Sequence, residues 1–153
     1  MGNPILTDDG VGFHVAKQLK TILDDQQVTV TDEDISGLNL LEMLIDYDKV
    51  VIIDAIQTPG GTAGHIYRLE PASFNYSLHS SSPHDVNLVT ALEFGRQLKI
   101  PLPQDIIIYA IEVEDVKTFS EKCTTEVQQV ISQCVDMVVE ELHNSGYKEI
   151  NLA

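Results

Sequence analysis

The chain has 153 residues, of which 43% are hydrophobic, which suits one folded domain (residues 1–153) with a sizeable core. It carries 24 acidic and 9 basic residues, a formal net charge of −15, and the few lysines and arginines do not cluster. We therefore expect neither nucleic acid nor an anionic membrane surface as a partner. The sequence contains no apolar run of about 18 residues, so no membrane span is predicted. Acidic residues near the amino terminus argue against a signal peptide, so a cytoplasmic protein is expected.

The first third of the chain alternates helical and extended patterns. A Gly-Asn-Pro turn is followed by Thr7 or Asp8 as the expected N-cap of a helix that reaches about residue 25. A short strand is predicted at 28–31. Gly37 then opens a second helix, which has leucines on one face.

Residues 49–56 are the stretch around which the sheet is expected to form. Four consecutive β-branched residues, 50–53, lead into Asp54. Such a run is typical of a strand buried on both faces, and the carboxyl ends of these strands open into the crevice where α/β sheets bind ligands. A buried carboxylate there costs free energy unless it is paired, hydrogen-bonded or bound to a metal. Asp54 is therefore a candidate site residue.

The remaining elements complete an α/β pattern. A strand at 65–70 follows the central strand after only about ten residues, too few for a parallel crossover, so it is predicted to be antiparallel. A long loop then leads to a helix from His84 to about Lys99, a buried strand at 105–111, and a helix at 124–144 closed by Gly146. The predicted fold is a single three-layer α/β domain, with a mainly parallel twisted sheet, one antiparallel strand and helices on both faces.

Three side chains occupy comparable positions in this pattern. Asp9 lies at the start of the first helix, Asp54 ends the central strand, and His84 starts the third helix. Helix starts and strand carboxyl ends share one edge of a parallel sheet, so the three side chains are expected to converge. Two carboxylates and an imidazole suit a divalent transition metal such as nickel, zinc or manganese. Taken singly, each has a simpler explanation, namely a favourable helix dipole, turn amides or a polar first turn.

Other groupings are weaker. Ser80–Ser82 lie near His84 but without the Gly-x-Ser-x-Gly elbow of a serine hydrolase. The Gly60–Gly64 turn lacks the Gly-Lys-Ser/Thr ending of a phosphate-binding loop. His79, in the same loop as His84, is kept only as a supporting residue. Cys123 and Cys134 are predicted to be free thiols.

Several motifs together resemble the hydrogenase maturation proteases, which trim the carboxyl-terminal extension of the nickel–iron hydrogenase large subunit. Residues 2–12, Gly-Asn-Pro-Ile-Leu-Thr-Asp-Asp-Gly-Val-Gly, are similar to the opening motif of that family. Residues 51–55 (Val-Ile-Ile-Asp-Ala) and 82–85 (Ser-Pro-His-Asp) resemble its second and third motifs, and 119–127 the segment before its last helix. The resemblance runs the length of the chain in the right order.

The resemblance implies that Asp9, Asp54 and His84 contact nickel already inserted in the large-subunit precursor, so that cleavage follows only on loaded substrate. It implies metal-assisted hydrolysis, with Asp9 and Asp54 as the catalytic carboxylates and Asp9 as the candidate general base. The expected partner is the precursor, met transiently by a monomer. Another divalent metal in place of nickel is left open.

Two departures from the family pattern carry expectations of their own. Family members have a strand before the Gly-Asn turn, and none precedes Gly2 here. We hypothesise that Met1 is an internal methionine taken as the start, and that the sheet without this strand folds poorly or borrows one from a partner. The family's glycine-rich loop after its second strand is matched here only by Asp32 and Gly37, so, if that loop helps to choose the precursor, the preference is expected to differ or to be lost.

Two alternatives of different classes stay open. A non-catalytic, metal-checking chaperone would keep the site geometry and bind precursor without cutting it. A flavodoxin-like binding module would use Asp54 and the Gly60–Gly64 turn for a small ligand, with Asp9 and His84 far from Asp54.

Overall fold

The computed structural model describes residues 1–23, 28–32, 39–73, 83–146 and 150–152, with the side chains of 83–87 and 150–152 left out. Five strands form one sheet in the order β1-β5-β2-β4-β3. The strands are β1 (Val28–Val30), β2 (Lys49–Ile56), β3 (Ile66–Leu69), β4 (Asp105–Glu112) and β5 (Ile150–Leu152). The helices are α1 (Val11–Ile22), α2 (Asn39–Leu44), α4 (Pro83–Gln97) and α5 (Thr125–Ser145), with 3-10 turns η1 (Thr7–Gly10) and η2 (Pro71–Ser73).

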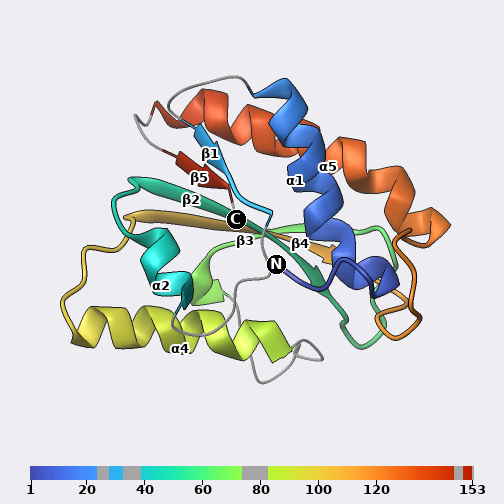
Figure 1. Cartoon of the computed structure of the whole chain (residues 1–153), viewed down its shortest axis with the longest axis horizontal. Coiled ribbons are helices and arrows are strands. Elements are labelled where there is room, and N and C mark those ends of the chain that lie inside the picture. The colour runs from blue at the N-terminus through green and yellow to red at the C-terminus, as the bar shows by residue number, and fades with distance from the viewer. Residues whose placement is uncertain (24–27, 33–38, 74–82, 147–149, 153) are drawn as a thin grey trace.

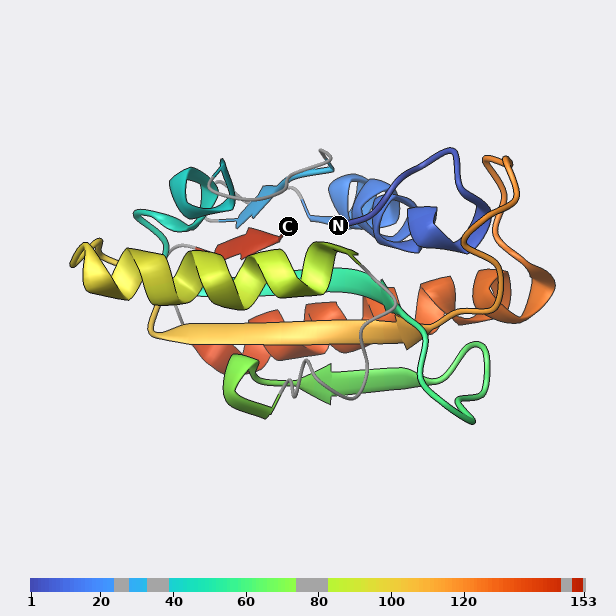
Figure 2. The same ribbon diagram turned by 90° about the horizontal axis from the view of Figure 1, so that it is seen from below.

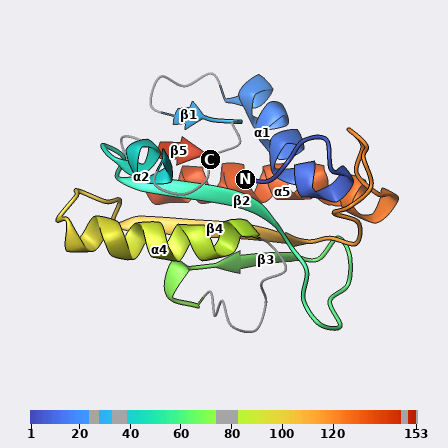
Figure 3. The same ribbon diagram turned by 60° about the horizontal axis from the view of Figure 1, so that its bottom comes forward.

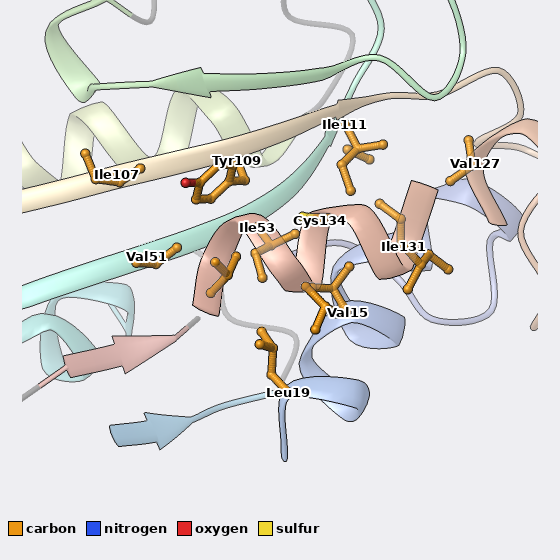
Figure 4. Close-up of a cluster of buried hydrophobic side chains, with 14 of the residues drawn as sticks. Val15, Leu19, Val51, Ile53, Ile107, Tyr109, Ile111, Val127, Ile131 and Cys134 are labelled. Atoms are coloured by element: carbon orange, nitrogen blue, oxygen red, sulfur yellow. The ribbon is translucent and has the colours of Figure 1, made fainter. Parts of the chain in front are cut away.

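The sheet is sandwiched between two helical layers. Helices α1 and α5 cover one face, and α2 and α4 cover the other (Figure 1). All eight residues of β2 are buried, because odd-numbered side chains such as Val51 and Ile53 pack with α1 and α5, while even-numbered ones such as Val50 and Ile52 pack with α2 and α4. Figure 4 shows the first of these clusters. Burying each such side chain stabilises the fold by about 1.5–3 kcal/mol. The predicted three-layer α/β architecture is confirmed.

Strands β2 and β4 form the parallel centre of the sheet. They pair over their full length, from Lys49 opposite Asp105 to Ile56 opposite Glu112. Strand β3 pairs with β4 in the antiparallel direction, as the short connection between β2 and β3 predicted. The mainly parallel sheet with one antiparallel strand is therefore confirmed.

Strand β5, which the sequence patterns did not predict, lies between β1 and β2 in the sheet. Residues Ile150–Leu152 pair in parallel with β1 on one side and with Lys49–Val51 on the other. Closer to the carboxyl end of β2, the amino group of Met1 donates a hydrogen bond of 2.5 Å to the Ile53 carbonyl oxygen. Successive carbonyls of a strand point to opposite sides, so carbonyls three residues apart point in opposite directions. The Ile56 carbonyl accepts a hydrogen bond from Val113 on the β4 side, and the Ile53 carbonyl therefore points away from β4. Residues 150–152 and Met1 thus both lie on the side of β2 that faces away from β4.

Some predicted element ends were wrong. Thr7 and Asp8 do not cap α1, whose N-cap is Gly10, because their side chains bond to a distant loop instead. Helix α1 ends at Ile22 rather than near residue 25. Strand β2 continues two residues beyond Asp54. By contrast, α5 ends as predicted at Gly146, which has a left-handed φ of 63°. The predicted role of Gly37 lies outside the described residues.

An ion-pair network joins α5 to the amino-terminal edge of the sheet. Lys49, only 2% exposed, donates to Asp105 at 2.8 Å and to Glu141 at 2.6 Å, and Arg68 donates to the second oxygen of Glu141 at 2.8 Å. The hydrogen bond from Arg68, with that from Lys49, lowers the pKa of Glu141 to about 2 despite partial burial. Burial disfavours the Lys49 ammonium, but its two acidic partners outweigh this effect and raise its pKa. Within the described residues, no helix has the length and apolarity needed to cross a bilayer.

Candidate active site

Asp54 lies near the carboxyl end of the central strand, on the face covered by α4. It stands opposite Ala110 of β4 and is 4% exposed. One carboxylate oxygen accepts a hydrogen bond of 3.0 Å from the Ala55 backbone N–H. Among the described residues, no other hydrogen bond to this carboxylate is present. A buried carboxylate with so little local compensation fits a group kept for an incoming ligand.

Asp9 is held beside the same edge by the amino-terminal turn. Its carboxylate accepts a hydrogen bond of 2.7 Å from the Asn3 N–H. Gly2, at φ 112°, packs so closely that an added Cβ would lie 2.0 Å from the Asp9 carbonyl oxygen. Met1, which precedes Gly2, is bonded to Ile53, the neighbour of Asp54. This short chain of contacts brings the two carboxylates predicted from the sequence to one edge.

The amino end of α4 reaches the same edge of the sheet. Helix α4 runs back along β2 and β4, with its first residues on the side of the carboxyl ends of both strands (Figure 2). His84 is in the first turn of this helix, and its side chain lies outside the described residues. The part of the chain that the structure describes contains no cluster of three potential metal ligands. The three-residue metal set therefore stays a prediction, of which two members share the expected edge.

Asp8, which the sequence patterns indicated only as a possible helix N-cap, is the carboxylate of this region that accepts the most hydrogen bonds. It is fully buried and accepts hydrogen bonds from the backbone N–H groups of Glu114, Asp115 and Thr124 at 3.2, 3.1 and 2.6 Å, and from the Thr124 hydroxyl at 2.9 Å. Thr124 is the N-cap of α5. Asp8 thus fastens the turn that carries Asp9 to the loop between β4 and α5.

Thr7 holds the same turn in a strained conformation. Its φ of 42° is in the left-handed region, which β-branched residues rarely adopt. Its hydroxyl donates to the Thr118 carbonyl at 2.6 Å and its N–H donates to the Ser120 carbonyl at 2.9 Å. Strain of this kind, of order 1–3 kcal/mol, is typical of functional sites, where surrounding contacts enforce it.

A cavity of about 350 Å³ is lined by residues that follow β2 and by the end of β4, including Glu112. Glu112 is buried at the end of β4 and accepts hydrogen bonds from the Thr58 N–H and hydroxyl and from the Tyr67 hydroxyl at 2.6, 2.8 and 3.2 Å. A Cβ at Gly61 would lie 2.2 Å from its carboxyl carbon, so the glycine-rich turn folds over this side chain. The sequence signal was available: like Asp54, Glu112 follows an apolar β-branched run.

The weaker groupings gain no catalytic role. Ser80–Ser82 and His79 lie outside the described residues. Cys123 and Cys134 are free, as predicted. Burial raises the pKa of Cys134 to about 12, and burial together with the Asp8 carboxylate raises that of Cys123 to about 11. Both thiols are therefore protonated at neutral pH and are poor nucleophiles.

The family model for hydrogenase maturation protease (HycI) matches residues 13–141. The chain belongs to the hydrogenase maturation protease family. The match includes Asp54 and His84 but begins after Asp9. The family resemblance inferred from the motifs is thereby confirmed, and a role as a maturation endopeptidase, a hydrolase, follows from it.

Solved structures of this family share the fold of the chain. The hydrogenase maturating endopeptidase HybD from Escherichia coli is 27% identical, with 96% of this chain and 91% of that chain covered and a TM-score of 0.80. A solution structure of an endopeptidase from Escherichia coli is also 27% identical, with 97% and 91% covered and a TM-score of 0.82. Hydrogenase 2 maturation peptidase from Thaumarchaeota archaeon SCGC_AB-539-E09 is 26% identical, with 92% and 93% covered and a TM-score of 0.66. Among curated proteins, no significant match was found.

Family membership and geometry together weigh against the flavodoxin-like alternative. That alternative required Asp9 to lie far from Asp54, whereas contacts through Met1 and Gly2 connect their surroundings. The Gly60–Gly64 turn is explained by the close approach of Glu112 and by Gly64, at φ 87°, lying against α5.

Proposed function

We propose that this hydrogenase maturation protease removes the carboxyl-terminal extension of the nickel-loaded large-subunit precursor of a nickel–iron hydrogenase. The observation that carries the proposal is the placement of Asp9 and Asp54 on the sheet edge reached by the amino end of α4. Membership of the maturation protease family supports it.

The proposed roles follow from donor chemistry. Two carboxylates and the His84 imidazole are oxygen and nitrogen donors of the kind that nickel accepts, with the ion presented by the precursor as part of the substrate. Another divalent metal would suit the same donors. Asp54 is buried and fixed, which suits a group that contacts the ion. Asp9, which is less buried, suits a general base that takes the proton of the attacking water. The scissile peptide would then be cut by metal-assisted hydrolysis, in which the chain supplies position and the base.

The proposed setting is a monomer in the cytoplasm that meets its precursor transiently. The two free cysteines support a reducing compartment.

The test is cleavage of purified precursor, nickel-loaded and nickel-free, followed by the size shift of the large subunit. The unmutated chain should cut only the loaded precursor, and Asp54→Ala and His84→Ala should each reduce cleavage by at least about a hundredfold. Asp136→Ala, which removes an exposed carboxylate of α5, is the matched control and should cut normally.

The outcomes separate the remaining alternatives. Precursor that is bound in a nickel-dependent way but never cut would favour the metal-checking chaperone. Equal cleavage of loaded and nickel-free precursor would contradict nickel recognition while leaving the peptidase role intact.

A further inference from the structure

Exposed apolar side chains are unevenly placed on the molecule. Among the described residues, the large hydrophobic side chains that are exposed are Ile5, Ile22, Phe94, Leu98 and Phe119. Ile22 ends α1 and Leu98 follows α4, which puts both at the amino-terminal edge of the sheet. Ile5, 48% exposed, and Phe119, 79% exposed, belong to the two segments that surround Asp8 and Asp9 at the opposite edge.

The backbones of these two residues lie side by side. Leu6 and Ser120 form a parallel bridge, in which the Ser120 N–H donates to the Ile5 carbonyl at 3.0 Å and the Thr7 N–H donates to the Ser120 carbonyl at 2.9 Å. The register sets Ile5 opposite Phe119, and paired strands are about 5 Å apart. Figures 1 and 3 show the loop between β4 and α5 beside the amino-terminal turn. We call the pair Ile5 and Phe119 the apolar lip.

The loop that carries Phe119 is held in place from several directions. Asp115 accepts hydrogen bonds of 2.9 Å from the N–H groups of both Lys117 and Thr118, and the Thr118 carbonyl accepts the Thr7 hydroxyl. The buried Asp8 carboxylate fixes both ends of the loop. An aromatic side chain on a fixed loop loses little conformational entropy when a partner covers it, which is the property of a binding anchor.

The apolar lip is next to the candidate site and has charged side chains around it. The Asp9 N–H donates to the Leu6 carbonyl at 2.9 Å, so the lip is one turn away from this carboxylate. Lys117 and Lys122 flank Phe119 in a loop that also carries Glu114, Asp115 and Glu121. An apolar centre with a polar rim is the usual composition of a protein-binding surface.

We infer that the apolar lip is the docking surface for the precursor polypeptide, where an apolar segment close to the scissile bond packs on Phe119 and Ile5, with Lys117 and Lys122 at the rim. A polypeptide fits better than a small molecule, because neither side chain lines the cavity above Glu112. The inference rests on the proposed function for the identity of the partner. It adds that part of the affinity is independent of nickel.

The experiment measures the dissociation constant of nickel-free precursor, which is bound but not cut. Phe119→Ser should weaken binding by about tenfold, as expected for loss of an aromatic anchor, and Phe119→Leu should retain most of the affinity. Leu98→Ser, at another exposed apolar position at the opposite edge, is the matched control and should bind like the unmutated chain. Equal thermal unfolding midpoints would show that all variants are folded.

Docking and cleavage fail in different ways in this design. If the loaded precursor is cut but Phe119→Ser binds as well as Leu98→Ser, the docking role is wrong and the peptidase role stands. If Phe119→Ser weakens binding while no chain cuts loaded precursor, the docking role stands and the peptidase role is wrong. Absence of any binding of nickel-free precursor to the unmutated chain, or a fall in kcat with unchanged affinity in Phe119→Ser, would overturn the docking role.

Discussion

Two neighbouring carboxylates at the candidate site differ in almost every physical respect. Asp8 is fully buried and accepts four hydrogen bonds from the loop before α5. Asp9 is only partly buried, and the turn around it is shaped by Gly2 and Asn3. Asp8 therefore holds the turn together, while Asp9 stays the residue of this pair proposed for the chemistry.

This assignment predicts opposite effects of the same substitution. Asp8→Asn replaces an acceptor by an amide whose N–H groups face other donors, so it should lower the free energy of unfolding by about 3 kcal/mol. Asp9→Asn should cost less than about 1 kcal/mol in stability but lower precursor cleavage by a hundredfold or more. Urea unfolding and cleavage assays check the pair. A variant Asp9→Asn that still cuts at the normal rate would remove Asp9 from the catalytic group.

Sequence reasoning found the candidate site residues whose signal is local. Asp54 stands at the end of an apolar β-branched run, and Asp9 and His84 stand at predicted helix starts. It missed Asp8, because the partners of this carboxylate are more than 100 residues away along the chain. It also treated Glu112 as a loop residue, because the predicted strand stopped one residue early. Long-range hydrogen bonds leave no periodic trace in a sequence.

At the scale of elements, α5 is anchored differently at its two ends. Its amino end is fixed by Asp8 through Thr124, beside the candidate site. Its carboxyl half is fixed through Glu141, which bonds to Lys49 of β2 and to Arg68 of β3. The helix therefore bridges both edges of the sheet, and its apolar stripe fills the core between them.

The Glu141 anchor predicts an acid-dependent loss of stability. Its pKa is lowered from 4.5 to about 2 on folding, so its charge stabilises the folded chain above pH 4.5, and this stabilisation is lost as the pH falls from 4.5 through 2. Glu141→Gln should be less stable than the unmutated chain at neutral pH and should lose less stability across that window. Glu140→Gln, at an exposed position of the same helix, should behave like the unmutated chain. Thermal unfolding midpoints measured against pH distinguish the three chains. Parallel curves for the unmutated chain and Glu141→Gln would contradict the anchor.

Elements with strong patterns were predicted well, and the short ones were not. The 21 residues of α5 carry apolar side chains at helical spacing over many turns, which predicts a helix. Strand β2 is a nearly continuous apolar run, which predicts a buried strand. Strand β5 has only three residues, with no alternation long enough to be read. Residues 150–152 form a strand because the sheet has a position for one between β1 and β2, which is a property of the sheet and not of these three residues.

At the scale of the whole molecule, the free energy of unfolding is expected to depend on β5. Asn151 is the middle residue of β5 and pairs with Thr29 on one side and Val50 on the other. Asn151→Pro removes a backbone donor from an internal strand and should lower the free energy of unfolding by roughly 3 kcal/mol. Asn151→Ala keeps the backbone donor and is the matched control. Urea unfolding curves that coincide for the two variants would show that β5 does not pair as described.

The position of β5 has a consequence for the order of folding. The strand that separates β1 from β2 comes from residues 150–152, far along the chain from both, so β1 can join the sheet only once this distant segment has paired. Strands β2 and β4, with α4 between them in the chain, can pair earlier, whereas β1 gains its neighbour only at the end. Contacts of such wide sequence separation form slowly. Folding is therefore expected to pair β2 with β4 first and to add β1 to the sheet, through β5, last.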